Sequence, residues 1–303
     1  MSFLPPGNHE RSLTVGPYER MYLVHVPIGD APSANWPVVL AFHGGGSNPA
    51  QMADFSGLSA TADKHGFVVV YPGGTGIIAA ARTFNAGNCC GRALRLGVDE
   101  IAFVTAMLAD LSQLIPLDQQ RIYATGMSNG ALLAYHVADK LSHRIAAIAP
   151  VAGPMGFATC SPTEPVSVVH FHGTADAFAP YTGGIGRKSV SKTNFFSVEQ
   201  SLAAWVNANG CASPPCVDEL PPQVDDGTRV TRHVHGHGHR DAEVVLYQIH
   251  GMGHTWPGRE TPFPALGRVT HNLDANEVLW AFFKKHPKSD TTAVNVGPER
   301  GKK

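Results

Sequence analysis

Short runs of apolar residues recur along the chain and predict buried β-strands. The run PVVLAF covers residues 37–42, and FVVVYP covers residues 67–72. Further strand-like runs cover residues 121–126, 145–151, 166–171 and 244–249. Apolar runs of about four to eight residues without polar alternation are typical of strands that are buried on both faces of a sheet.

Between these runs, apolar residues recur at helical spacing. Met52, Phe55, Leu58 and Ala62 predict a helix from Pro49, a favourable first-turn residue, to Gly66. The predicted helices cover residues 49–66, 101–115, 129–141, 198–207 and 274–283. Residues 73–97 are rich in Gly and Ala and show no period, so we predict a long loop there, of the kind that is often functional.

The alternation of strands and helices predicts an α/β fold with a mostly parallel central sheet flanked by helices. No repeat and no change in composition marks a linker, so residues 11–286 are predicted to form a single domain. Residues 1–10 are interpreted as an N-terminal extension. The polar residues 287–303 are interpreted as a flexible C-terminal tail.

Composition agrees with a folded chain and excludes some partners. Hydrophobic residues make up 43% of the 303 residues and charged residues 16%, which is far from the balance of disordered chains. The formal net charge of -1 offers no positive surface for nucleic acid or for an anionic membrane. No apolar stretch is long enough to span a bilayer.

The compartment is left open by the sequence. The start, MSFLPPGNHERSLTVG, lacks a basic region followed by an apolar one, so the chain is either cytoplasmic or a mature form without its leader. Five cysteines are too few and too unevenly spaced for a disulfide scaffold. In an oxidising compartment, Cys89 or Cys90 could bridge to Cys160, and Cys211 could bridge to Cys216; otherwise all five are free thiols.

The strongest chemical signal is GMSNG at residues 126–130, which lies between a predicted strand and a predicted helix. This GxSxG pattern predicts a sharp turn that exposes the hydroxyl of Ser128 as a nucleophile. Gly126 and Gly130 are expected because side chains there would collide with neighbouring backbone. The following helix would direct its first amide groups and the positive end of its dipole at the reaction centre.

A serine hydroxyl needs a base to remove its proton, and the fold expects the order Ser, Asp, His along the chain. His254 lies in GMGHTWPG, a glycine-rich loop after the strand VVLYQI, and is the preferred base among 16 histidines. His250 is its nearest rival. Asp176 follows the strand VSVVHF and lies between Ser128 and His254 in sequence, so it is the predicted carboxylate.

HGGGS at residues 43–47 follows a predicted strand and is a candidate oxyanion hole. We expect the amide of Gly45 to donate to the developing alkoxide, with Gly44 or Gly46 as alternatives. The second donor would be the amide of Asn129, the residue after the nucleophile. Trp256 and Phe178 flank the proposed His and Asp, and either line an apolar substrate pocket or belong to the core.

These segments resemble a known family. HGGGSN, NAGNCCG, GVDEIAFV, ATGMSNGA, HFHGTADAFAPYTGG and GMGHTWPG look like the polyhydroxybutyrate depolymerase and feruloyl esterase family of α/β-hydrolases, over most of the chain. The resemblance implies the α/β-hydrolase fold, a triad of Ser128, Asp176 and His254, and substrates that are hydroxyalkanoate or hydroxycinnamate esters. Many members of the family are secreted. Relatives often carry a cysteine where this chain has HVHGHGHRD, so that partner for Cys211 is missing here.

Four histidines, at 233, 235, 237 and 239, alternate along one segment. In a strand they would share one face and could bind zinc, nickel or copper, whereas the glycines between them favour a loose hairpin tip. We therefore predict no metal and no cofactor. The resulting hypothesis is a serine carboxylesterase that acts on a small or polymeric ester through an acyl-enzyme. The alternatives are a peptidase or acyltransferase of the same fold, or a binding module without activity.

Overall fold

A single ten-stranded sheet runs through the protein, in the strand order β1-β2-β4-β3-β5-β6-β7-β10-β9-β8. The computed structural model describes residues 3–29, 31, 34–78 and 81–289. The strands are β1 (Gly7–Val15), β2 (Tyr18–Val26), β3 (Trp36–Phe42), β4 (Val68–Pro72), β5 (Leu117–Met127), β6 (Ala147–Val151), β7 (Ser167–Gly173), β8 (Cys216–Leu220), β9 (Arg229–His235) and β10 (Val244–His250). The six strands from β4 to β10 in the sheet order are parallel, and the hairpins at the two edges are antiparallel.

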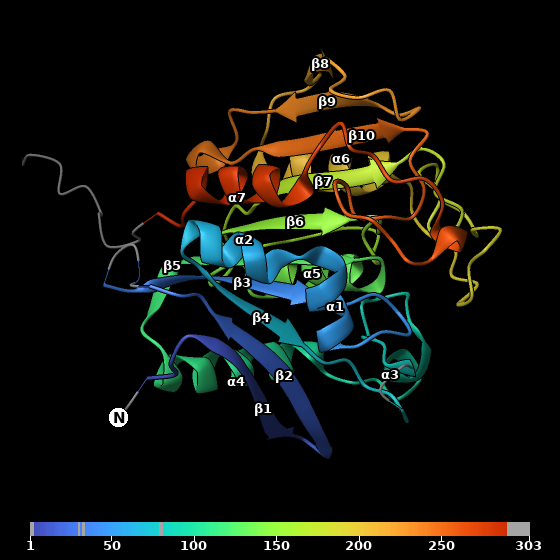
Figure 1. The fold of residues 1–303 in the computed structure, drawn as a ribbon. Helices are drawn as coiled ribbons and strands as arrows, with labels where there is room; N and C mark the ends of the chain where they lie inside the picture. Colours follow the sequence, from blue (N-terminus) through green and yellow to red (C-terminus); the bar gives the residue numbers. More distant parts are fainter. Residues whose placement is uncertain (1–2, 30, 32–33, 79–80, 290–303) are drawn as a thin grey trace, which may run out of the picture.

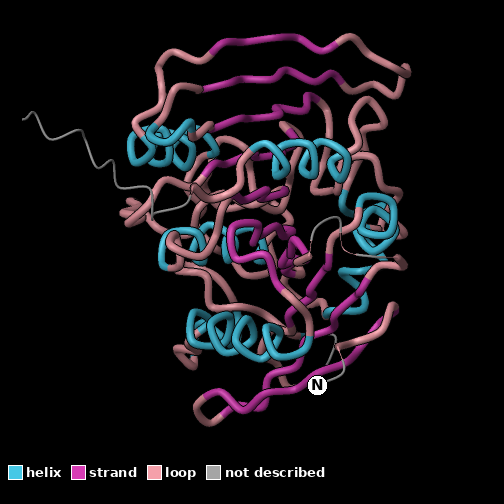
Figure 2. Tube along the Cα trace, turned by 90° about the vertical axis from the view of Figure 1, so that its left-hand side faces the viewer, coloured by secondary structure: helices cyan, strands magenta, loops and turns pink. Residues whose placement is uncertain are grey.

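Helices cover both faces of this sheet (Figures 1 and 2). The helices are α1 (Pro49–Ser56), α2 (Leu58–His65), α3 (Gly91–Arg95), α4 (Glu100–Leu114), α5 (Asn129–Lys140), α6 (Val198–Asn209) and α7 (Ala275–Lys285). Buried side chains of α4, α5 and α6 form one core layer, and those of α1, α2 and α7 form the other. The prediction of an α/β-hydrolase fold with a mostly parallel sheet is confirmed. None of the helices in the described residues is both long and apolar enough to cross a membrane.

The predicted helix over residues 49–66 is in fact two helices. Asn48 caps α1 by accepting a hydrogen bond from the Gln51 amide, but Gly57 takes the left-handed conformation at φ 62° and ends the helix. A second helix starts directly afterwards and ends at Gly66, which is also left-handed. The periodic apolar positions span both helices because both pack on the same face of the sheet. Periodicity alone therefore did not reveal the break.

The N-terminal boundary also differs from the prediction. β1 begins at Gly7 and pairs along its whole length with β2, so residues 7–10 belong to the sheet rather than to an extension. This strand alternates between half-buried and exposed positions. Its sequence, GNHERSLTV, is mostly polar and contains no apolar run that would predict a strand. At the other end, Lys288 donates its amide to Gln120 O and pairs with Glu164, and residues 290–303 lie outside the described residues.

The segment 73–97 contains the short helix α3 and is tied together by hydrogen bonds. Thr75 and Thr83 form an antiparallel bridge, and the Asn88 amide donates to Gly156 O. Cys89 and Cys90 are bonded to each other, while Cys160, Cys211 and Cys216 are free thiols. The bridges to Cys160 and between Cys211 and Cys216 that the sequence left open are therefore absent. Cys211 instead donates a hydrogen bond to Ala242 O at 3.4 Å.

Candidate active site

The loops that follow β3, β5, β7 and β10 leave the sheet at the carboxyl ends of its parallel strands. This edge lies on the right in Figure 1, where the loop after β10 and helix α3 also lie. In open α/β sheets, ligands bind at this edge because the loops there are free to carry polar groups. The motifs that carry Ser128, Asp176, His254 and the glycine loop fall on these loops, whereas the alternating histidines do not.

Ser128 lies in a strained turn between β5 and α5. Its φ of 55° and ψ of -117° are unusual for a residue with a side chain, and its amide donates to Val151 O at 2.9 Å. The amides of Ala131 and Leu132 return to the Ser128 carbonyl and start the helix. Because the backbone bends so sharply, the half-buried side chain stands at the start of α5 rather than packing along it.

The two glycines of GMSNG are required by close backbone packing, as predicted. A Cβ on Gly130 would lie 2.1 Å from Phe42 O, and one on Gly126 would lie 2.5 Å from the Gly130 carbonyl group. Real Cβ atoms do not approach backbone oxygen that closely, so neither position accepts alanine without a backbone shift. The result is that α5 starts directly against the end of β3.

The structure brings Asp176 and His254 together. His254 Nδ1 donates to Asp176 Oδ2 at 2.6 Å, and the amides of Phe178 and Ala179 donate to Asp176 Oδ1 at 2.8 and 2.9 Å. Burial by itself would raise the pKa of Asp176, but the contacts with His254 and His172 outweigh it, and the pKa is lowered well below its usual range. Asp176 is therefore an anion that accepts a hydrogen bond from His254 Nδ1 and orients the His254 ring.

His254 is less closely connected to Ser128 than to Asp176. His254 is 5% exposed, its amide donates to Leu266 O, and its ring stacks on Phe178 with ring centres 5.0 Å apart. Neither Ser128 Oγ nor His254 Nε2 has a hydrogen-bond partner within the described residues, so their mutual hydrogen bond is not formed here. Catalytic hydrogen bonds are often long in unliganded enzymes and shorten when substrate binds.

The rival base, His250, is occupied elsewhere. It lies on the last residue of β10, where its Nε2 shares a hydrogen bond of 3.1 Å with Thr231 Oγ1 on the neighbouring strand β9. That contact faces the β8–β9 edge rather than the turn at Ser128. Among the two candidates, only His254 contacts the carboxylate.

The glycine loop after β3 lies directly beside the nucleophile. A Cβ on Gly44 would lie 3.7 Å from Ser128 Cβ, and one on Gly45 would lie 3.8 Å from Asn129 Cβ. The Gly46 amide already donates to Arg82 O at 2.9 Å, so the alternative that used Gly46 as an oxyanion donor is wrong. The Asn129 amide lies in the first turn of α5, where no intrahelical acceptor exists. Gly45, Gly44 and Asn129 thus remain as donors.

Two buried side chains, whose roles the sequence did not predict, fix the glycine loop and the start of α5 to the segment after β4. His43 accepts the Gly74 amide on Nε2 at 2.9 Å and donates from Nδ1 to Gly44 O at 2.7 Å. The Asn129 side chain exchanges two hydrogen bonds with the backbone of Phe84. The signal for His43 was its place at the head of HGGGS, where a polar residue directly follows a fully buried strand.

A buried ion pair holds the segment after β4 in place. Arg20 and Glu100 are 2.7 Å apart with side chains 2% and 1% exposed, and Arg20 also donates to Gly73 O. Glu100 accepts the Asn85 amide. Glu100 lies in the first turn of α4, and its contact with Arg20 is a finding of the tertiary structure.

Phe178 and Trp256, the two candidate substrate-binding aromatic residues, lie in different environments. Phe178 is half-buried and lies on the face of the His254 ring, beside the reaction centre. Trp256 is 0% exposed, and its indole donates to Asn276 Oδ1 on α7 at 2.9 Å. The expectation that Trp256 binds substrate is therefore wrong, and its core alternative holds because the loop after His254 turns inward to pack on α7.

The alternating histidines do not share a face. His233 and His235 lie on β9, but that strand ends at His235, and His237 and His239 follow in a loop and a single 3-10 turn. His233 pairs with Gln248, and His235 pairs with Ala212 O. No group of three or more potential ligands that could hold a metal occurs in the described part of the chain.

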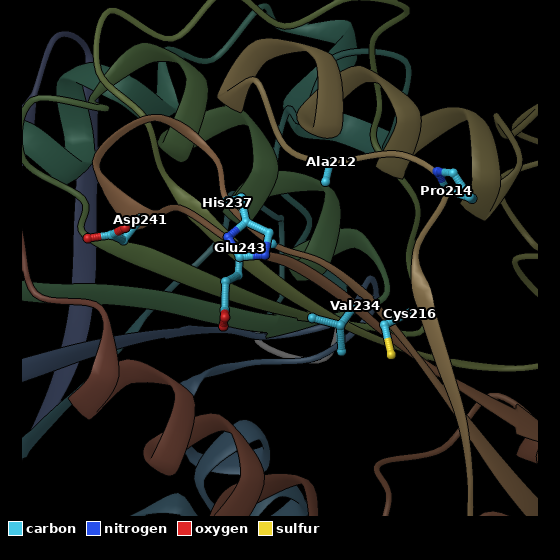
Figure 3. Close-up of a pocket in the computed structure, with 8 residues that line it drawn as sticks. Ala212, Pro214, Cys216, Val234, His237, Asp241 and Glu243 are labelled. Atoms are coloured by element: carbon cyan, nitrogen blue, oxygen red, sulfur yellow. The ribbon is translucent and has the colours of Figure 1, made fainter.

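A hollow of about 370 Å³ lies beside this segment, but it is not the candidate active site. Figure 3 shows its lining, which comes from the loop before β8, from β9 and from the turn before β10. It is lined by Ala212, Pro214, Cys216, Val234, Gly236, His237, Asp241 and Glu243. None of the residues around Ser128 takes part.

Comparison with known proteins assigns the family. A family model described as esterase PHB depolymerase matches residues 20–182, which is more than half of the chain and includes Ser128 and Asp176. "Putative esterase NocK" from Nocardia uniformis subsp. tsuyamanensis is 29% identical over 276 residues, which are 86% of this chain and 77% of that protein. Feruloyl esterase B from Piromyces equi is 26% identical over 203 residues, 65% of this chain but only 37% of its own length.

Solved structures give the same fold. An acetyl xylan esterase from Aspergillus awamori superimposes with a TM-score of 0.53 at 16% identity, over 82% of this chain and 94% of that one. At such low identity the likeness shows the fold alone. Together with the family match, it leads to one conclusion: the chain belongs to the esterase PHB depolymerase family, a group of carboxylic ester hydrolases with the α/β-hydrolase fold.

Proposed function

We propose that the protein cleaves its ester by a serine mechanism in which Ser128 is the nucleophile, His254 the general base and Asp176 the carboxylate that orients it. The observation that carries this proposal is the buried 2.6 Å hydrogen bond from His254 to Asp176, at the sheet edge where Ser128 occupies its strained turn. A buried Asp–His pair beside a serine in such a turn is the arrangement that activates a hydroxyl.

The chemistry follows from the tautomer. Since Nδ1 of His254 carries the proton shared with Asp176, Nε2 is free to take the proton of Ser128 as Oγ attacks the ester carbonyl. Collapse of the tetrahedral intermediate breaks the bond to the alcohol, and His254 returns the proton to the departing oxygen. Water, deprotonated by His254, then attacks the acyl-enzyme, and His254 returns this proton to Ser128 Oγ as the acid is released. No cofactor enters these steps.

The oxyanion would be stabilised by the amides of Gly45 and Asn129. Both belong to segments fixed by buried contacts, Gly45 beside His43 and Asn129 through its own side chain on Phe84. Fixed donors stabilise a developing charge without reorganising, and each such donor contributes about a hundredfold to a thousandfold in rate. Gly44 is the alternative donor on the same loop.

We further propose an ester with a substantial apolar part, such as a hydroxyalkanoate or hydroxycinnamate ester. Most of the exposed large apolar side chains in the described residues lie on the loops after β4, β7 and β10, which surround the candidate site. They are Ile77, Ile78, Leu94, Leu96, Ile185, Val190 and Phe263. Apolar surface around a polar reaction centre favours apolar acyl or alcohol groups.

The test begins with Ser128→Ala. Hydrolysis of a short-chain p-nitrophenyl ester and labelling by a serine-directed fluorophosphonate should both disappear while the unfolding midpoint stays within a few degrees of the wild-type value. Turnover that survives in Ser128→Ala would contradict the triad. A panel of methyl ferulate, acetylated xylan and hydroxybutyrate oligomers tests the substrate class, and preference for acetylated xylan would contradict the apolar preference.

A further inference from the structure

Two histidines in β7 are completely buried and take no part in the steps above. His170 and His172 are 0% exposed and lie two residues apart, so they point to the same face of the sheet. That face carries α5 and α6. Histidine is costly to bury without partners, so the contacts of these rings need an explanation.

The two rings form the middle of a hydrogen-bond chain. Tyr135 OH lies 3.0 Å from His170 Nδ1, and His170 Nε2 lies 3.0 Å from His172 Nδ1. His172 Nε2 lies 2.8 Å from Ala179 O and 3.5 Å from Asp176 Oδ2. The chain therefore runs from helix α5 through β7 to the carboxylate that contacts His254.

Only one pattern of protons satisfies every atom when all three groups are neutral. Ala179 O and Asp176 Oδ2 can only accept, so His172 carries its proton on Nε2 and its Nδ1 must accept. His170 then donates from Nε2, which leaves its Nδ1 to accept from the Tyr135 hydroxyl. Each donor thus points the same way, toward Asp176.

Burial favours the neutral forms of His170 and Tyr135. Burial, followed by the neighbouring His172, lowers the pKa of His170 well below its usual range. Burial also raises the pKa of Tyr135 well above its usual range, so the hydroxyl keeps the proton that it donates.

Both ends of the chain belong to the candidate site. Tyr135 lies on α5, the helix that starts at Ser128. Ala179 accepts from His172 through its carbonyl and donates its amide to Asp176, so the loop that holds the carboxylate is anchored at its centre. The chain therefore connects the helix of the nucleophile with the loop of the acid.

We propose that the Tyr135–His170–His172 chain positions Asp176 for its hydrogen bond with His254, with His172 as the positioning residue in direct contact and Tyr135 fixing the direction of the chain. This role rests on the proposed function of the triad. It predicts that changes in the chain act on the rate of the chemical step more than on substrate binding, because an ill-placed Asp176 leaves the His254 ring free to turn.

The experiment compares four variants. His172→Phe removes both polar atoms of the ring, and His172→Gln restores a donor near the position of Nε2. Tyr135→Phe removes only the terminal hydroxyl. Tyr123→Phe is its matched control, because Tyr123 is also 0% exposed but its hydroxyl has no hydrogen-bond partner among the described residues. Two properties are measured: kcat and KM for a p-nitrophenyl ester, and the downfield proton resonance of the His254 Nδ1–H.

We expect kcat of His172→Phe to fall by about tenfold to a hundredfold with KM nearly unchanged, since a displacement of about 1 Å can cost about a hundredfold. His172→Gln should recover much of this loss. In Tyr135→Phe kcat should fall by about threefold, because a weakened hydrogen bond raises the barrier only slightly. The resonance should weaken or shift in His172→Phe and Tyr135→Phe, but not in Tyr123→Phe.

The proposal is overturned if Tyr135→Phe matches Tyr123→Phe in kcat and keeps the wild-type resonance. This conservative variant decides the matter even if His172→Phe does not fold. The resonance is observed without turnover, so it tests the chain separately from the triad. Turnover in Ser128→Ala would remove the triad and leave the structural role of the chain to be judged by the resonance.

Discussion

The burial of His43 makes the stability of the protein depend on pH. Burial lowers the pKa of the His43 imidazole to about 4, and the hydrogen bond with Gly44 only partly opposes this change. The neutral ring accepts the Gly74 amide on Nε2. Protonation would place a second N–H against that amide, so the folded state resists it.

The magnitude follows from the two pKa values. In the unfolded chain His43 has its ordinary pKa of about 6.5, so between about pH 6.5 and pH 4 the unfolded state binds a proton that the folded state does not. Stability therefore falls as the pH falls through this window and stays constant above it. At about 1.4 kcal/mol for each pKa unit, His43 contributes a loss of about 3 kcal/mol.

Urea denaturation of the wild type and of His43→Gln, at pH 7 and at pH 4, isolates this contribution. Other groups titrate in both proteins, so the quantity of interest is the difference between the two pH dependences. Glutamine does not titrate, and the wild type should lose about 3 kcal/mol more than the variant. A wild-type loss equal to that of His43→Gln, or an NMR titration of His43 near its ordinary pKa, would refute the reasoning.

Two further predictions concern packing at the site. Gly130→Ala should destabilise the protein by at least about 3 kcal/mol or prevent folding, because the new Cβ would meet Phe42 O at 2.1 Å; a urea midpoint within about 0.5 kcal/mol of wild type would contradict the geometry. Trp256→Phe should lower the unfolding midpoint through the lost packing and the lost hydrogen bond to Asn276, with KM for p-nitrophenyl esters nearly unchanged. A large change in KM without loss of stability would return Trp256 to the substrate pocket.

The local sequence pattern predicted those structural elements that depend only on residues close in sequence. Apolar runs located the buried parallel strands, and helical spacing located α4 to α7, because burial of a whole strand or of one helix face imposes that pattern. The same approach missed β1, β2, β8 and β9, in which polar residues interrupt the apolar run. It also merged α1 with α2, since the turn at Gly57 leaves the apolar period intact.

The candidate site residues also divide into those that the sequence predicted and those that it left open. GMSNG was readable because a sharp turn against β3 requires Gly126 and Gly130 whatever the rest of the chain does. The contact between His254 and Asp176 could only be expected from the order of the motifs. The roles of Trp256 and of the alternating histidines were open, since burial and face depend on which element packs against them.

The sequence by itself determined the buried parallel strands and the main helices between them, the strained turn at Ser128 and the loops on which polar residues gather, because these follow from short-range sterics and from the period of apolar residues. Only the tertiary structure decided that Gly46 is not a free donor, that Arg20 pairs with Glu100, and that Tyr135, His170 and His172 connect two distant segments. Such contacts join residues far apart in the chain, and their geometry exists only after the sheet has brought its strands into register.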